Sequence, residues 1–452
     1  MTKEYDLVVV GAGPAGAMAA KTAAENGLTV ALLERKKEIT QIRRSCAMMW
    51  LAFNEPYFGD FFRFNRRNNR LCFPVNGFSI KYSGPYKNLY AVHIYSSDAN
   101  LIRFGDCETG KKRGDDAKIA MVHDKSNLLR DLINESETLG VDIYPGVNVT
   151  GIEKLSNGVL VTGSGQTFNS VFVIAADGVN SRLAALLGFN QGRTYYGMML
   201  ATSYRMTDVE FFDPDAFTML FYGHPTPSIF AISPRAAGDG FYLICLTFDP
   251  RVEHAPLYDH LTNKSPFAHA FKNAKKLEEY SAVENLWEPI YEPYRDYVHF
   301  IGDTSWSQEA ENAGALMCGW KAAHAVTLAL LEKKINKEGV SSYLTWWKRS
   351  YCDNYNYTDY LKNYLMCNVF TNEEINYLFS LIQETMPATL DAYKTNQLMG
   401  AQLMKVMPRI AAEKPNLVPK IQRFASAPLE ELFSEMINAG YPNRQEMQAD
   451  ME

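Results

Sequence analysis

The stretch "YDLVVVGAGPAGAMAAKTAAENGLTVALLE", residues 5–34, decides the predicted fold. It opens with an almost wholly apolar run, Tyr5 to Val10, which is typical of a buried parallel strand. A glycine-rich turn, an alanine-rich helix and a second apolar strand follow, and Glu34 ends the unit. A strand, GxGxxG turn, helix and second strand with a terminal acid predict a dinucleotide-binding unit at the head of a doubly wound parallel sheet.

Each glycine of this turn has a physical task. We expect Gly11 to permit the tight turn, Gly13 to let the backbone approach a pyrophosphate, and Gly16 to let helix and strand pack closely. Ala15 lies in the same turn, where the helix N-terminus offers N–H donors to phosphate. Glu34 stands 18 residues after Gly16, where an acid can bind a ribose 2′-hydroxyl and would disfavour a 2′-phosphate. The alternative is a plain βαβ turn, which requires neither the acid nor the glycine spacing.

Composition narrows the class of protein. The chain has 452 residues, enough for two or three domains, and 47% of them are apolar. A net charge of −6 argues against a nucleic-acid partner or an anionic membrane. The seven cysteines form no CxxC pair, so we expect a reducing, cytoplasmic location and no metal site. No signal peptide is expected before the first strand, and the apolar segment 313–331 carries Lys321 and His324, which disfavours a membrane span.

Two distant segments repeat the pattern of an acid at the end of a strand. "VFVIAADGVNSRLAALLG" (171–188) runs into Asp177-Gly178, and "YVHFIGDTSW" (297–306) runs into Gly302-Asp303. Ligands of doubly wound sheets bind at the carboxyl ends of the strands, so both acids are candidate cofactor residues. The alternative is that they only cap turns. Between the first unit and the second acid, residues 140–178 predict short strands separated by Asn-Gly and Ser-Gly turns.

Together the three motifs resemble those of FAD enzymes built like para-hydroxybenzoate hydroxylase, a superfamily of aromatic hydroxylases, flavin halogenases and geranylgeranyl reductases. The resemblance implies FAD as cofactor, with Asp303 at the ribityl chain and Asp177 near the pyrophosphate. It places Lys125 where many members carry an arginine, and Val149 on a strand edge along the adenine. The same resemblance implies cofactor contacts from further residues, namely Arg35, Arg44, Gly178, Gly302, Ala313, Gly314 and Ala315.

The implied fold class is α/β. An FAD-binding, Rossmann-like parallel sheet is expected from residues 1–50, 120–187 and 291–335. An antiparallel-sheet substrate domain, rich in Phe and Tyr, is expected from residues 51–119 and 188–290, and a helical C-terminal region from 336–452. In that tail Asn372 is the expected N-cap of a helix. Its dense tyrosines suit a lid, a dimer face, a lipid contact or an ordinary aromatic core.

The geranylgeranyl reductase branch fits better than the others. Flavin halogenases carry a Trp-x-Trp-x-Ile-Pro motif, which this sequence lacks. Geranylgeranyl reductases carry a cysteine near the flavin at the position of Cys46, twelve residues after Glu34, although here its neighbours are Ser45 and Ala47. "SIFAISPRAAGDGFYLICL" (228–246) resembles their Tyr-x-Trp-x-Phe-Pro segment but lacks its aromatic residues. The resemblance therefore implies the branch more firmly than a geranylgeranyl substrate.

Reduction of a carbon–carbon double bond requires a proton donor near the flavin. The candidates are Cys46, Glu309 and Glu311, and the two glutamates stand where the family's proline and glycine cluster is missing. Their alternatives are a packed thiol and acids favoured by a helix N-terminus. Arg43 and Arg44 contact the flavin or a substrate carboxylate in one interpretation and are solvated in the other.

The predicted function is FAD-dependent reduction, or dehydrogenation, of a carbon–carbon bond in an apolar or aromatic small molecule. The electron donor, NAD(P)H or a ferredoxin-like carrier, is not identified by any motif, and a membrane contact is not expected. The alternatives are an aromatic hydroxylase that uses O2 and NAD(P)H, and a flavin-binding protein without turnover, because one scaffold hosts all three.

Overall fold

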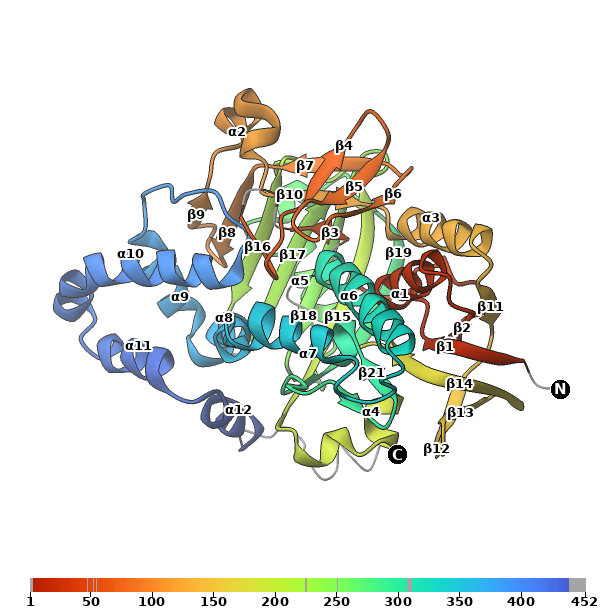
Figure 1. Cartoon of the computed structure of the whole chain (residues 1–452). Helices are drawn as coiled ribbons and strands as arrows, with labels where there is room; N and C mark the ends of the chain where they lie inside the picture. Colours follow the sequence, from red (N-terminus) through yellow and green to blue (C-terminus); the bar gives the residue numbers. More distant parts are fainter. Residues whose placement is uncertain are drawn as a thin grey trace.

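The computed structural model of the chain describes residues 3–46, 48–51, 53, 55–223, 226–249, 251–306 and 311–438. Two large sheets form its centre, and helices from the second half of the chain cover both of them (Figure 1). The mixed α/β fold expected from the sequence is confirmed, with a parallel sheet, an antiparallel sheet and C-terminal helices.

The first sheet contains the dinucleotide-type unit. Five strands are parallel in the order β11-β2-β1-β14-β21, so the first strand of the chain lies at the centre. All five residues of β2 are buried, which explains its continuous apolar sequence. The bounds are β1 (Glu4–Val10), α1 (Pro14–Glu25), β2 (Val30–Glu34), α3 (Lys125–Thr138), β11 (Asp142–Pro145), β14 (Gln166–Ala175) and β21 (Val298–Phe300).

The predicted meander lies on the edge of the same sheet. β12 (Val149–Leu155) and β13 (Gly158–Gly163) pair antiparallel and return the chain to β14, whose first half pairs with β13 and whose second half pairs with β1 and β21. This connection brings the chain back beside β1 at the end where Asp177 follows β14. At that edge the short β20 (Tyr294–Arg295) pairs with β21.

The helix α6 (Glu311–Leu331) packs along α1 (Figure 1). Gly319 makes this contact possible, because a Cβ there would lie 2.3 Å from the carbonyl oxygen of Ala15 and 3.0 Å from the amide nitrogen of Ala19. Within the described residues, α6 is the one helix long and apolar enough to cross a membrane, but 67% of the apolar window is buried inside the protein. That burial is typical of a core helix.

The second sheet has seven strands in the order β19-β15-β18-β17-β16-β8-β9 and is antiparallel except between β8 and β16. One face packs on α5 (His254–Asn263), and the other face packs on C-terminal helices. Its strands are β8 (Ala91–Ser96), β9 (Leu101–Phe104), β15 (Tyr195–Thr207), β16 (Ala216–Tyr222), β17 (Ser228–Pro234), β18 (Phe241–Thr247) and β19 (Lys275–Trp287).

Two small sheets close the space between the large ones. Their strand orders are β3-β10-β7 and β4-β5-β6. The short helices α2 and α4 lie in the connections around them and after β14. The bounds are β3 (Met49–Trp50), β4 (Arg63–Asn65), β5 (Arg70–Phe73), β6 (Phe78–Lys81), β7 (Tyr86–Leu89), β10 (Ala120–His123), α2 (Cys107–Arg113) and α4 (Arg182–Leu186).

The C-terminal region is helical, as expected, and wraps around one side of the second sheet (Figure 1). The expected N-cap at Asn372 is wrong by one residue. Thr371 caps that helix and forms a capping box with Glu374, which leaves Asn372 free to accept a hydrogen bond from the Gly223 amide at 2.7 Å. The helices are α7 (Ser341–Trp347), α8 (Tyr357–Val369), α9 (Asn372–Ser380), α10 (Ala392–Glu413), α11 (Leu417–Ser426) and α12 (Leu429–Asn438).

Gly319→Ala is expected to lower the free energy of unfolding by about 1–3 kcal/mol, because the added methyl group forces α6 away from the backbone of α1. The matched control is Gly400→Ala on α10, where a Cβ meets nothing within 4 Å. That control should raise stability by about 0.5–1 kcal/mol through helix propensity. Urea denaturation of the three proteins tests the pair, and equal midpoints for both variants would contradict the packing argument.

Candidate functional site

The glycine-rich turn has the geometry that a bound pyrophosphate requires. Gly11 has φ +101°, and a Cβ there would lie 2.3 Å from the carbonyl oxygen of Ala176. A Cβ on Gly16 would lie 1.8 Å from the carbonyl oxygen of Gly11, so the protein's own packing requires both glycines. A Cβ on Gly13 would meet nothing within 4 Å. The space beside Gly13, at the N-terminus of α1, therefore fits the phosphate-binding role expected for it.

Glu34 lies at the end of β2 and is buried. Its Oε2 accepts a hydrogen bond from the Ala12 amide at 2.8 Å, and its Oε1 accepts one from the Lys36 amide at 2.9 Å. The carboxylate therefore orders the glycine-rich turn itself. Each oxygen retains a further lone pair, so a role as ribose ligand remains compatible with this geometry and remains a prediction.

Four cations gather beside this turn. Arg35 and Arg44 are exposed, Lys36 is half-buried and Lys125, the first residue of α3, is buried. Burial lowers the pKa of Lys36, Glu34 opposes that shift, and Arg44, Lys125 and Arg35 add to it. Such an excess of positive charge suits a diphosphate. Lys36 was missed by the sequence analysis, although its position two residues after the terminal acid is a usable signal.

The second motif acts partly as a cap. Asp177 accepts hydrogen bonds from the Ser181 hydroxyl at 2.7 Å and the Leu183 amide at 3.1 Å, at the start of α4. Burial raises the pKa of this carboxyl. The hydroxyl of Thr304 accepts a hydrogen bond from the Gly178 amide at 3.0 Å and thereby joins the second motif to the third. Thr304 was not a candidate, because the bond links residues 126 positions apart.

The third motif forms a short 3₁₀ turn, η4 (Gly302–Thr304), directly after β21. Gly302 has φ +62°, and the side chain of Asp303 is half-buried. Four further residues that are expected to contact the cofactor lie in β12 and α6. Val149 is buried at the start of β12, and the first turns of α6 contain the buried residues Ala313, Gly314 and Ala315. Their contacts with FAD remain predictions.

Two of the three proton-donor candidates lie in one neighbourhood. The Nζ of Lys125 is 3.7 Å from the Sγ of Cys46, and Ser45 ties the same loop to β15 through a 2.6 Å bond between its hydroxyl and that of Ser203. The positive charge of Lys125 also acts to lower the pKa of the Glu311 carboxyl. Glu309 lies outside the described residues. The structure therefore brings Cys46, Lys125 and Glu311 together at the junction of the two large sheets.

Glu311 begins α6 with φ +50°, a left-handed conformation that is unfavourable for a residue with a side chain. Burial raises the pKa of its carboxyl to about 7. Lys125 and Arg44 oppose the shift, and Asp303 and Glu284 favour it. A carboxyl of this kind is protonated for about half of the time at neutral pH, so it is able to donate a proton there.

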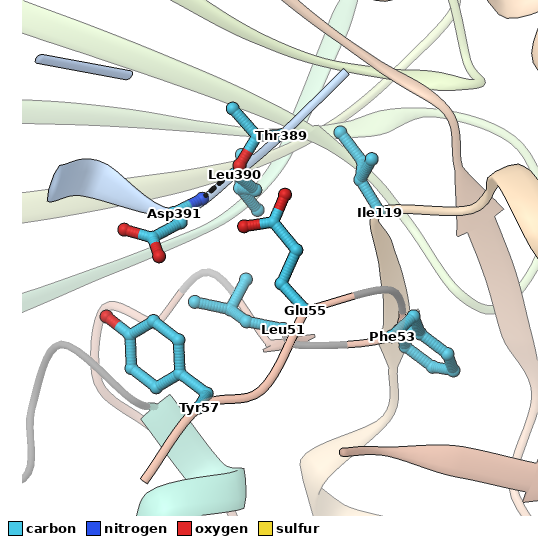
Figure 2. Close-up of a pocket in the computed structure, with 8 residues that line it drawn as sticks. All are labelled: Leu51, Phe53, Glu55, Tyr57, Ile119, Thr389, Leu390 and Asp391. Atoms are coloured by element: carbon cyan, nitrogen blue, oxygen red, sulfur yellow. Dashed lines mark hydrogen bonds between the residues drawn. The ribbon is translucent and has the colours of Figure 1, made fainter. Parts of the chain in front are cut away.

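A separate pocket lies between the 51–57 segment and the chain that enters α10 (Figure 2). Its two acids are already engaged. Glu55 pairs with Lys394 at 2.9 Å, and Asp391 caps α10 by accepting a hydrogen bond from the Tyr393 amide at 2.9 Å. We assign it to the joint between the second sheet and the helical region. The lining residues are Leu51, Phe53, Glu55, Tyr57, Ile119, Thr389, Leu390 and Asp391.

Comparisons with known proteins agree with this geometry. Two models described as "FAD binding domain" match residues 6–62 and 102–283. The digeranylgeranylglycerophospholipid reductase of Methanococcus vannielii is 25% identical over 362 residues, which cover 78% of this chain and 84% of that protein. Digeranylgeranylglycerophospholipid reductase 2 of Methanopyrus kandleri is 24% identical over 428 residues, which cover 92% and 98%.

The chain is an FAD-dependent oxidoreductase, and it is similar over most of its length to digeranylgeranylglycerophospholipid reductases.

Solved structures place this oxidoreductase in the same fold. A geranylgeranyl bacteriochlorophyll reductase-like protein from Thermoplasma acidophilum superposes with a TM-score of 0.69 at 18% identity and covers 94% of this chain and 100% of its own. The flavin-dependent brominase Bmp2 superposes with a TM-score of 0.58 at 16% identity and covers 97% and 99%. These likenesses concern the fold alone. FAD fits the oxidoreductase's site through the open space at Gly13 and the cations around Lys36.

Thr304→Val is expected to weaken FAD binding about tenfold, because the half-buried Gly178 amide loses its acceptor between the second and third motifs. Thr304→Ser keeps the hydroxyl and should retain wild-type affinity. Titration of the apoprotein with FAD, followed by protein fluorescence, measures both. Unchanged affinity in the valine variant would show that the bridge does not support the cofactor site.

Proposed function

We propose that the oxidoreductase reduces carbon–carbon double bonds in the isoprenoid chain of a lipid. The observation that carries this proposal is the carboxyl of Glu311, with a pKa of about 7, which interacts electrostatically with Lys125, whose ammonium lies 3.7 Å from the Cys46 thiol. Two curated relatives that match most of this chain are named as reductases of a digeranylgeranyl lipid, which supports the substrate class.

An apolar substrate suits the second sheet. Its face toward the C-terminal helices presents the half-buried side chains of Met219, Tyr242 and Leu246 beside the fully buried Ile229 and Ile244. Half-buried apolar side chains on an inner face give a hydrocarbon chain a surface to pack on. The aromatic residues of the family's Tyr-x-Trp-x-Phe-Pro segment are Ile229, Ala231 and Ser233 here, so the groups in contact with the isoprenoid differ from those of its relatives.

Reduced FAD, when bound, would supply a hydride for one carbon of the double bond. This chain must supply the proton for the other carbon, so that two C–H bonds form while the π bond of the alkene, an N–H bond of the reduced flavin and one O–H bond of the donor break. We assign the proton to Glu311. Lys125 and Arg44 stabilise the carboxylate that remains, whereas Asp303 and Glu284 disfavour it and so promote its reprotonation. Cys46, 3.7 Å from the Lys125 ammonium, is the alternative donor.

The function is tested by reducing the purified holoprotein photochemically without oxygen and mixing it with a geranylgeranyl glycerophospholipid. The expected result is reoxidation of the flavin together with a product two mass units heavier for each double bond reduced. Product formed only when O2 is admitted, and sixteen mass units heavier, would identify a hydroxylase instead. Reoxidation by O2 with neither product would leave a flavin-binding protein without turnover on this lipid.

Turnover should depend on pH through Glu311. Because the raised pKa keeps the donor protonated below about pH 7, wild-type activity is expected to be high below that value and to fall as pH rises through it. Glu311→Gln should retain FAD and lose at least about 100-fold in single-turnover rate, with a flat residual pH profile.

The control is Glu332→Gln, an exposed acid just beyond the other end of α6, which should keep the wild-type profile. Full activity in Glu311→Gln with loss of activity in Cys46→Ala would transfer the proton-donor role to the thiol.

A further inference from the structure

The second residue of α6 carries a buried amide without a partner. Asn312 is 3% exposed, and its Nδ2 donates a hydrogen bond to no group of the described chain. A buried N–H without an acceptor costs free energy, and native proteins keep such groups rare. The position of Asn312 therefore calls for an acceptor that the described residues do not supply.

A buried polar atom without a partner in the described chain does not always call for a ligand. Both ring nitrogens of His299, for example, are unpaired, but the ring is packed in β21 between Tyr294 at 5.1 Å and Tyr343 at 5.3 Å, and burial lowers its pKa to about 3. It is a neutral core histidine. Asn312 differs because it stands at a helix N-terminus beside the candidate functional site.

The surroundings of Asn312 come from the first and third FAD motifs and from Lys125. Its neighbour Glu311 interacts electrostatically with Asp303 of the third motif and with Lys125. The same helix packs through Gly319 on the backbone of Ala15, in the first turn of α1. The N-terminus of α6 also adds positive potential and free N–H groups. The unpaired donor and the positive potential both suit a ligand that has several hydrogen-bond acceptors and can take up electrons.

We propose that Asn312 binds the flavin, with its carboxamide N–H donating a hydrogen bond to a carbonyl oxygen on the pyrimidine edge of the isoalloxazine ring. That edge carries carbonyl acceptors, which match the donor that the chain leaves unpaired. Reduction increases the negative charge at this edge, so a donor there stabilises reduced more than oxidised FAD. Asn312 is thus a cofactor-binding residue that raises the flavin's reduction potential.

The test compares wild type with Asn312→Leu, which has a similar volume and no polar atoms. In the apoprotein, the leucine variant should have an equal or higher Tm, because it removes an unpaired buried amide. Its affinity for FAD should be about tenfold weaker, as expected for one lost hydrogen bond. Its two-electron midpoint potential should fall, by about 30 mV for each tenfold loss of preference for reduced FAD.

The matched control is Thr327→Val on the same helix, which removes a buried hydroxyl bonded to Asn26 at 3.0 Å, away from the predicted flavin contacts. It should lower stability and leave the potential unchanged. A leucine variant with a destabilised apoprotein and an unchanged potential would overturn the proposal and make Asn312 structural.

The inference rests on FAD binding and not on the lipid substrate. Failure to reduce a geranylgeranyl lipid, with the expected shift in potential, would reject the proposed function and keep Asn312. If the protein reduces the lipid but Asn312→Leu keeps the wild-type potential, the proposed function stands and the assignment of Asn312 is rejected. A wild-type protein that binds no added FAD would overturn both.

Discussion

The contact between α1 and α6 is the constraint on which the site depends. Gly16 lets α1 approach the turn at Gly11, and Gly319 lets α6 approach Ala15, so two helices about 300 residues apart in the sequence share one backbone interface. Side chains at either glycine would require the backbones to separate by more than an ångström. Because α6 follows the third motif in the chain, this interface sets the distance between the phosphate-binding turn and Glu311 at the start of α6.

Opposing contributions from burial and from neighbouring charges set the pKa of Glu311. Lys125 and Arg44 favour the ionised form of Glu311, whereas burial, Asp303 and Glu284 favour the protonated form, and the second set prevails. The same cations surround Lys36 and lower its pKa. A diphosphate bound near them would neutralise part of this positive charge and shift the balance at Glu311 further toward the protonated form. Cofactor binding and the proton donation proposed for Glu311 are therefore electrostatically coupled in this arrangement.

The scaffold itself does not select the reaction. The protein superposes over nearly its whole length on a reductase-like protein and on a brominase, at similarly low identity. What differs within such a fold are the loops at the carboxyl ends of the strands. Here the segment after Asp303 lacks the family's proline and glycine cluster and carries acids instead, and the strand at 228–234 lacks its aromatic residues. These two changes lie in segments where we expect chemistry and substrate to be determined.

The sequence by itself determined the parts that depend on local pattern. The order of strand, glycine turn and helix, the acids at the strand ends, the meander and the helical tail all arise from short-range periodicity and turn chemistry. Local signals place the end of a helix only to within about one residue. The sequence predicts Asn372 as the N-cap of α9, but Thr371 is the residue that caps it. Hydroxyl and amide side chains cap helices almost equally well, so the sequence does not distinguish these two neighbours.

Only the tertiary structure decided which groups meet. Thr304 bonds to Gly178, Lys125 approaches Cys46, and Glu311 acquires its raised pKa from elements that are remote in the chain. No single segment encodes burial or a neighbour's charge, because both depend on the packing of several segments at once. The sequence therefore identified the cofactor, whereas the three-dimensional arrangement raised the pKa of Glu311 and left the buried amide of Asn312 without a partner among the described residues.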